Sequence, residues 1–484
     1  MAGSLKAKTV NGLSWSLIDN LANQGITFIV GIVLARLLTP HEYGIIGIIL
    51  IFLAFFNSLV DSGFSSALIR KTDARAVDYN TVFIVNLVLS LVLFAVLFLI
   101  APAVGRYFDL PLLVPTLRVM GSIVIINALA IVQRTHLIKK IDFKTQTKVS
   151  VVASVSSGVL GIGMAYGGMG VWSLVAQQIS RQLVNSLLLW LYNKEWTPKL
   201  EFSVRSFKEL FNFGWKVMVV GMIGTVWEEL YQGVIGKCYA PQTLGQFTRA
   251  NQFRNIFSRN LATVVQRVSY PVLSSLQDNN DHLRESFRKI VRVTFFVSSV
   301  SMLMIGAVAK PMILVLIGEK WLQAVVFLRI ICFSGLWNPL TYLNTNMLQV
   351  QGKSGVLLKL EILKRSIAVV PIIFGIYIDI IWMLWGSVAS NFLIFLIDAH
   401  VAGKQIGYPV LRQVIDILPS FVIAMIVGAC VLGMSHIEIR PILLLPLQCL
   451  VGLVLVVAIC EMTGNKEYRE IKTILISFIK KLKH

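Results

Sequence analysis

Arginine residues stand inside long apolar stretches of this chain, where a positive charge is costly. Arg181 lies within the stretch 170–193, and Arg249 and Arg259 lie within 244–270. An arginine at the centre of a bilayer costs about 2.5–3.5 kcal/mol on insertion scales, so such residues are expected to face a watery cavity or a partner. A guanidinium keeps its charge, and its fork of donors matches phosphate oxygens. These residue types predict a site for an anion.

Polar neighbours extend each arginine into a stripe. At about 100° per residue, the polar side chains of each stretch share one face of a helix. The face in 170–193 consists of Ser173, Gln177, Gln178, Arg181 and Asn185. The face in 244–270 consists of Arg249, Gln252, Asn255, Arg259, Asn260, Thr263, Gln266 and Arg267, with Arg254 outside it. Amide side chains suit sugar hydroxyls, so a phosphate that bears a glycan would satisfy both kinds of group.

The candidate substrate-binding residues come from these two stretches, Arg254 lying off the polar face, and from Arg118 in the stretch 111–133. They are Arg181, Arg249, Arg259, Arg118, Arg254, Gln177 and Gln252. The alternative is that individual arginines only brace neighbouring helices.

Acidic residues inside the apolar stretches are fewer. They include Asp19, Asp61, Glu228 and Glu229. Two interpretations stay open for each: a structural ion pair with an arginine, or protonation or cation binding that couples transport to an ion gradient.

The elements that must position these residues are membrane spans. The 484 residues have a mean hydropathy of +0.76 and are only 14% charged, against about a quarter for soluble proteins. A span needs about 20 apolar residues. Fourteen stretches qualify: 10–35, 43–68, 80–104, 111–133, 147–168, 170–193, 209–236, 244–270, 290–309, 322–350, 355–378, 380–402, 413–434 and 441–462. The fold class expected is an all-α, multi-pass membrane protein.

The distribution of basic residues predicts the orientation. With the N-terminus in the cytoplasm, the tails and the links on that side hold 30 of the 44 Lys and Arg residues, and the opposite side holds six. The cytoplasmic links are 69–79, 134–148, 194–208, 271–292, 351–365 and 403–412. This asymmetry follows the positive-inside rule and places both termini in the cytoplasm. It also accounts for the net charge of +20 without a nucleic-acid partner.

A repeated corner indicates an internal duplication. RLLTPHEYG at 36–44 and KCYAPQTLG at 237–245 share a cation, a proline and a glycine at the same spacing. Six spans separate the copies, which predicts two parallel six-helix repeats with a substrate path between them. The expected divisions are a lobe at 1–193, a linker at 194–208, a lobe at 209–402, two extra spans in 403–462 and a cytoplasmic tail at 463–484.

The tail has the pattern of an amphipathic helix on an anionic membrane surface. Its apolar stripe consists of Ile471, Leu475, Phe478, Ile479 and Leu482, and its basic residues include Lys472, Lys480, Lys481 and Lys483.

The segment 12–48, which contains LARLLTPHEYG, and LGQFTRANQF at 244–253 resemble the polysaccharide exporters (Wzx type) of the MOP flippase superfamily, and the colanic-acid exporters most. The resemblance extends along nearly all of 8–460. It implies two six-helix lobes, alternating access, and flipping of an undecaprenyl-pyrophosphate-linked oligosaccharide from the cytoplasmic to the periplasmic leaflet of the bacterial inner membrane. It further implies that cavity cations contact the pyrophosphate and glycan, which we carry onto Arg181, Arg249 and Arg259, and then onto Arg118 and Arg254.

The expected partners are the lipid-linked oligosaccharide, membrane lipids, and the glycosyltransferases or polymerase of the same pathway. No cofactor and no metal site is expected, and an ion gradient or the membrane potential is expected to drive transport. Two alternatives remain. A MATE-type small-molecule exporter would favour acids and aromatics over arginines. A membrane-embedded ligase or polymerase would need a larger outer connection than 309–321, and the sequence contains no HExxH, GxSxG or Walker motif.

Overall fold

The computed structural model describes residues 2–61, 63–277 and 279–482. These residues form α-helices with two short 3-10 helices, and no strand occurs among them. They group into two compact units, residues 1–245 and 246–484. We describe each unit by itself. The lobe boundaries expected from the sequence remain predictions.

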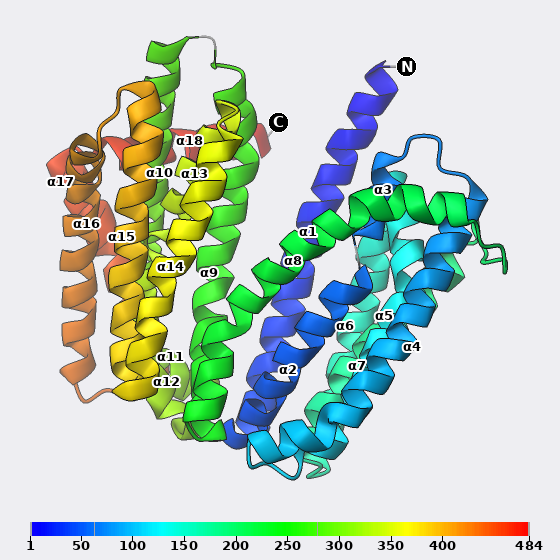
Figure 1. Cartoon of the computed structure of the whole chain (residues 1–484). Helices are drawn as coiled ribbons and strands as arrows, with labels where there is room; N and C mark the ends of the chain where they lie inside the picture. The colour runs from blue at the N-terminus through cyan, green and yellow to red at the C-terminus, as the bar shows by residue number, and fades with distance from the viewer. Residues whose placement is uncertain (1, 62, 278, 483–484) are drawn as a thin grey trace. The chain divides into compact units, whose positions relative to one another are not determined.

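Unit 1 is a helical bundle that combines pairs of successive helices with pairs far apart in the chain (Figure 1). Helix α1 packs on α6, α6 on α7, α7 on α5, and α5 on α4, while α8 lies along α2 and α3. Its helices are α1 (Ala2–Leu37), α2 (Pro40–Asp61), α3 (Phe64–Arg70), α4 (Ala76–Tyr107), α5 (Leu113–Lys139), α6 (Phe143–Tyr166), α7 (Val171–Tyr192) and α8 (Val204–Cys238).

Unit 2 is built around the pairs α10–α16 and α14–α15, with α12 and α13 against α15. Its helices are α9 (Pro241–Ser274), α10 (Asn280–Ala307), α11 (Ala309–Leu316), α12 (Leu322–Gly335), α13 (Asn338–Val350), α14 (Ser354–Tyr377), α15 (Ile380–Ile406), α16 (Val410–Gly433), α17 (Pro441–Thr463) and α18 (Lys466–Leu482). The first five residues of α9 belong to unit 1.

The chain is a multi-pass membrane protein. Eleven helical segments of the described residues are long and apolar enough to cross a bilayer. The other three expected spans contain helices α7, α9 and α14, which do not belong to this set of eleven. The exact number of spans and their orientation therefore remain predictions.

Several helices extend into segments expected to be cytoplasmic links. Helix α5 continues to Lys139, so Arg134 is helical, and α14 begins at Ser354, so Lys364 is helical too. The 27 residues of α5 are about 40 Å long, which exceeds the hydrocarbon thickness. A hydropathy window ends at the first cluster of charges, whereas backbone hydrogen bonding continues the helix beyond it.

The repeated corners pack against each other. Each copy begins a helix with proline, at Pro40 or Pro241, where the missing N–H costs nothing. A Cβ atom on Gly44 would overlap the carbonyl of Pro241, and a Cβ atom on Gly245 would overlap the carbonyl of Pro40. The correspondence in the sequence thus marks a reciprocal close contact between two backbones, while the six-helix repeats remain a prediction.

The C-terminal tail forms helix α18, as its periodicity predicts. Tyr468 and Ile471 pack against the apolar cluster of α10, α16 and α17. Glu467 pairs with Arg292 of α10, and Lys472 pairs with Glu461 of α17. The side chains of Leu475, Phe478, Ile479, Lys480, Lys481 and Leu482, and all of Lys483, lie outside the described residues.

Candidate functional site

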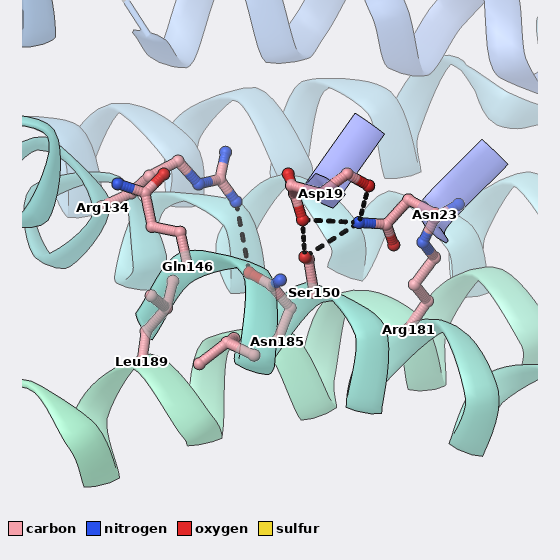
Figure 2. Close-up of a pocket in the computed structure, with 9 residues that line it drawn as sticks. Asp19, Asn23, Arg134, Gln146, Ser150, Arg181, Asn185 and Leu189 are labelled. Atoms are coloured by element: carbon pink, nitrogen blue, oxygen red, sulfur yellow. Dashed lines mark hydrogen bonds between the residues drawn. The ribbon is translucent and has the colours of Figure 1, made fainter. Parts of the chain in front are cut away.

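A polar cavity of about 350 Å³ lies inside unit 1, between helices α1, α5, α6 and α7. Figure 2 shows that these four helices contribute charged and amide side chains to a single space. The lining residues are Asp19, Asn23, Arg134, Gln146, Val149, Ser150, Arg181, Asn185 and Leu189.

Hydrogen bonds between α1 and α6 fix the acidic wall of this cavity. The Asn23 amide donates to Asp19 Oδ1 at 2.7 Å and to Ser150 Oγ at 2.9 Å. The Ser150 hydroxyl donates to Asp19 (Figure 2). The Ser154 hydroxyl, outside the lining, donates to Asn23 Oδ1 at 2.6 Å. Asp19 and Asn23 are four residues apart on α1, so one helical face presents both. The network holds the Asp19 carboxylate in one orientation.

Two arginines form the basic part of the lining. Arg181 comes from α7 and Arg134 from α5, and Arg134 donates to Asn185 Oδ1 at 3.4 Å. Within the described part of the chain, neither guanidinium has a carboxylate within 4.0 Å. The Gln146 amide nitrogen is buried and has no hydrogen-bond partner there. Two guanidiniums against one carboxylate give the cavity an excess positive charge and free donors for an anion.

The sequence-predicted residues of unit 1 are only partly brought together. Arg181 and Asp19 line the cavity. Arg118 instead lies over the Phe98 ring at 4.2 Å and donates to the Phe98 carbonyl at 3.3 Å. Gln177 packs against Gly161 between α6 and α7. Of these four, only Arg181 and Asp19 belong to this cavity.

The predicted basic residues of unit 2 have separate surroundings. Arg249 is 6% exposed, donates to Gln252 Oε1 at 2.5 Å and lies 5.8 Å from the Trp321 ring. Arg254 donates to Asn255 Oδ1 at 2.8 Å and lies against Gly335. Arg259 is exposed. The binding roles assigned to Arg249, Arg254, Arg259 and Gln252 remain predictions.

The other acids predicted to couple transport lie outside the cavity lining. Asp61 is exposed and accepts a hydrogen bond from Ser65 at 2.7 Å. Glu229 accepts one from Gln232 at 2.5 Å, and Glu228 is exposed. Their coupling roles also remain predictions.

Sequence reasoning missed Arg134, Gln146 and Ser150. Arg134 begins a run of charges that indicates a link, and Gln146 falls within the same expected link, 134–148. A signal was present, because Asn127 and Arg134 are seven residues apart and share a helical face if the helix continues. Ser150 carries no comparable signal, because a serine in a small-residue helix such as α6 is ordinary.

Comparison with known proteins finds similarity to polysaccharide biosynthesis proteins. The family described as polysaccharide biosynthesis protein matches residues 33–326, more than half of the chain. The teichuronic acid biosynthesis protein TuaB of Bacillus subtilis (strain 168) is 24% identical over 72% of this chain and 73% of its own. The lipopolysaccharide biosynthesis protein WzxC of Escherichia coli (strain K12) is 23% identical over 77% of this chain and 76% of its own.

Among solved structures, the lipid II flippase MurJ in an inward closed conformation has the same fold. Its TM-score is 0.75 at 12% identity, covering 95% of this chain and 99% of MurJ. The resemblance inferred from 12–48 and 244–253 is thereby confirmed.

Proposed function

Since the chain belongs to the polysaccharide biosynthesis protein family and has the fold of MOP-superfamily transporters, we propose that it flips an undecaprenyl-pyrophosphate-linked oligosaccharide from the cytoplasmic to the periplasmic leaflet by alternating access. The observation that carries the proposal is the cavity with Arg134 and Arg181 inside a bundle of membrane helices. Both guanidiniums are half-buried and lack a carboxylate within 4.0 Å in the described part of the chain, so an accompanying anion would stabilise them. A phosphate group supplies that anion.

The substrate chemistry follows from the lining. Arg134 and Arg181 would donate charge-assisted hydrogen bonds to the pyrophosphate, which are about twice as strong as neutral ones. The Gln146 and Asn185 amides would hydrogen-bond the phosphate or the first sugar. The acidic network of Asp19 keeps the cavity from holding its anion too tightly, which a transporter needs in order to release its cargo.

The alternatives are less compatible with these residues. A MATE-type exporter of organic cations would meet an excess of arginine in this cavity. A ligase or polymerase is less compatible with a fold like that of the lipid II flippase MurJ.

Arg181→Ala and Arg134→Ala should each reduce export at least tenfold. A hydrogen bond to a charged group contributes roughly 1.5–3 kcal/mol, so the loss of one guanidinium should weaken pyrophosphate binding by ten- to a hundredfold. Surface polysaccharide is measured in a strain that lacks the chain and carries each variant. In parallel, lipid-linked repeat units on the inner leaflet are quantified, and they should accumulate.

Lys148→Ala is the matched control for these variants. Lys148 is exposed on α6 and does not line the cavity, so its loss removes one positive charge nearby without touching the site. Export equal to the parent from both arginine variants, with normal protein in the membrane, would contradict the proposed site. An equal loss of export in Lys148→Ala would show that export responds to the overall positive charge of this region rather than to the cavity.

We further propose that Asp19 couples transport to an ion gradient or to the membrane potential. Asp19→Asn preserves the shape of the side chain but removes the titratable group. In proteoliposomes, this variant should flip substrate down its concentration gradient yet lose the response to an imposed ion gradient. Asp109→Asn, in the exposed loop between α4 and α5, is the control. If Asp19→Asn responds to the imposed ion gradient as the parent does, Asp19 does not have this role.

A further inference from the structure

A second cavity in unit 1 shares no residue with the first. It has a volume of about 440 Å³ and lies between α3, the loop that follows it, and α8. Its lining consists of Ala67, Arg70, Lys71, Thr72, Asp73, Glu209, Leu210, Asn212, Phe213 and Lys216.

The walls of this cavity are fixed by close packing. Gly63 has a φ of 66° and turns the chain from α2 into α3. A Cβ atom there would overlap the carbonyl of Gly214, so the glycine lets α3 lie directly on α8. Phe64 then packs against Phe207 and Phe211, with ring centroids 6.1 and 6.2 Å apart. The packed helices α3 and α8 therefore fix two walls of the cavity, and the loop after α3 completes it.

Three cations line this cavity: Lys71 is paired with carboxylates, whereas Arg70 and Lys216 have none nearby among the described residues. Lys71 Nζ lies 3.0 Å from Glu209 and 3.2 Å from Asp78. Burial alone would lower the pKa of Lys71, but its hydrogen bonds to these carboxylates raise it overall, so this lysine stays charged and paired. Arg70 and Lys216 are exposed, and in the described ranges neither has a carboxylate within 4.0 Å.

The position of these two cations fits the phosphate level of a bilayer. Arg70 is the last residue of the apolar segment 40–70, and its guanidinium lies over the Phe213 ring at 4.6 Å. Lys216 stands within α8 where the apolar part of that helix begins. Long basic side chains at the ends of spans extend to the headgroup region, and each attracts anionic lipid. Contact with the Phe213 ring helps to orient the planar Arg70 guanidinium, whose fork of donors can bind two oxygens.

We propose that this cavity, with Arg70 and Lys216 as its two cations, binds the phosphate group of an anionic membrane lipid. Arg70 offers a planar fork to two phosphate oxygens, Lys216 offers a point charge, and the Thr72 hydroxyl offers a further donor. Asp73 is the acid of the lining without a cationic partner among the described residues, and it opposes the anion. The inference does not depend on which substrate the protein transports.

The test uses the full-length protein in nanodiscs of phosphatidylcholine with increasing phosphatidylglycerol. Bound phosphatidylglycerol is counted by native mass spectrometry. The double variant Arg70→Ala/Lys216→Ala should weaken phosphatidylglycerol binding about tenfold or more. Each basic residue near an anionic membrane surface contributes attraction to the lipid, and this variant removes two. Asp73→Asn should strengthen it. The opposite directions separate a site from a folding defect, and a melting curve in pure phosphatidylcholine checks that the variants fold.

Arg205→Ala/Lys208→Ala is the matched control. It removes the same charge from exposed residues at the start of α8 that do not line the cavity. It should bind phosphatidylglycerol within twofold of the parent. A second arm titrates inorganic phosphate alone and follows the melting temperature. If phosphatidylglycerol alone stabilises the protein, the site recognises a whole lipid headgroup. If inorganic phosphate stabilises it as well, the phosphate group is sufficient for binding.

Three results would overturn the proposal: unchanged lipid binding by Arg70→Ala/Lys216→Ala, an equal loss in the control pair, or no gain from Asp73→Asn. An equal loss in the control pair would mean that lipid binding depends only on the total positive charge around α3 and the start of α8.

Discussion

Gly44→Ala and Gly245→Ala should each lower the melting temperature of the purified protein by about 3–6 °C, which corresponds to an overpacking cost of about 3 kcal/mol. In both cases the added methyl group meets a backbone carbonyl, of Pro241 or of Pro40. A flexible side chain could move aside at little cost, but a carbonyl at the first turn of a helix moves only with that helix. The melting temperature is measured in detergent by intrinsic fluorescence.

The chain supplies its own controls on α8. Gly224 and Gly233 are helical, and a Cβ atom added at either meets nothing within 4 Å. Their alanine variants should melt at or slightly above the parent temperature, because alanine favours a helix over glycine by about 1 kcal/mol. If Gly44→Ala and Gly245→Ala melt like these controls, the reciprocal contact does not exist.

The double variant Gly44→Ala/Gly245→Ala tests whether the two glycines belong to the same contact. A Cβ atom on Gly245 would also come within 3.1 Å of the Gly44 nitrogen, so both substitutions act on one contact. Once the first methyl group has separated the two corners, the second costs less. The combined loss should therefore fall short of the sum of the single losses, as expected for coupled neighbours.

This contact also illustrates what could be predicted from the sequence. The long apolar runs predict the helices well, since twenty apolar residues have few stable alternatives in a bilayer. The spacing of Pro40 and Gly44 against Pro241 and Gly245 predicts a duplicated corner. That the two corners touch is not predictable, because spacing along a chain carries no information about which copy packs on which.

The candidate site shows the same division. The arginine on the polar face of 170–193 and Asp19 were predicted, because a charge in an apolar stretch is conspicuous. Their neighbour Arg134 was missed, because a helix that continues past a charge resembles a link. Arg118 was included although the Phe98 ring covers it. A helical projection gives directions around one axis and does not say which neighbouring helix covers a face.

Lys364→Met should be among the most damaging single substitutions in unit 2. Lys364 of α14 is 8% exposed and lies 3.3 Å from both carboxylate oxygens of Asp398 of α15, which is 1% exposed. Loss of the ammonium leaves Asp398 buried without its cation, which costs about 3–5 kcal/mol. The expected results are a melting temperature lower by about 3–10 °C and less protein in the membrane.

The opposite substitution, Asp398→Asn, should cost much less, and this asymmetry tests the explanation. Lys364 also lies 2.7 Å from Glu361, which is 41% exposed, so the ammonium keeps a carboxylate when Asp398 is neutralised. For the same reason Glu361→Gln should change the melting temperature little, because Asp398 remains. The double variant Lys364→Met/Asp398→Asn should recover most of the stability that Lys364→Met loses, since no buried charge is then left alone. Equal losses from Lys364→Met and Asp398→Asn, without recovery in the double variant, would mean that packing volume rather than the buried carboxylate determines stability here.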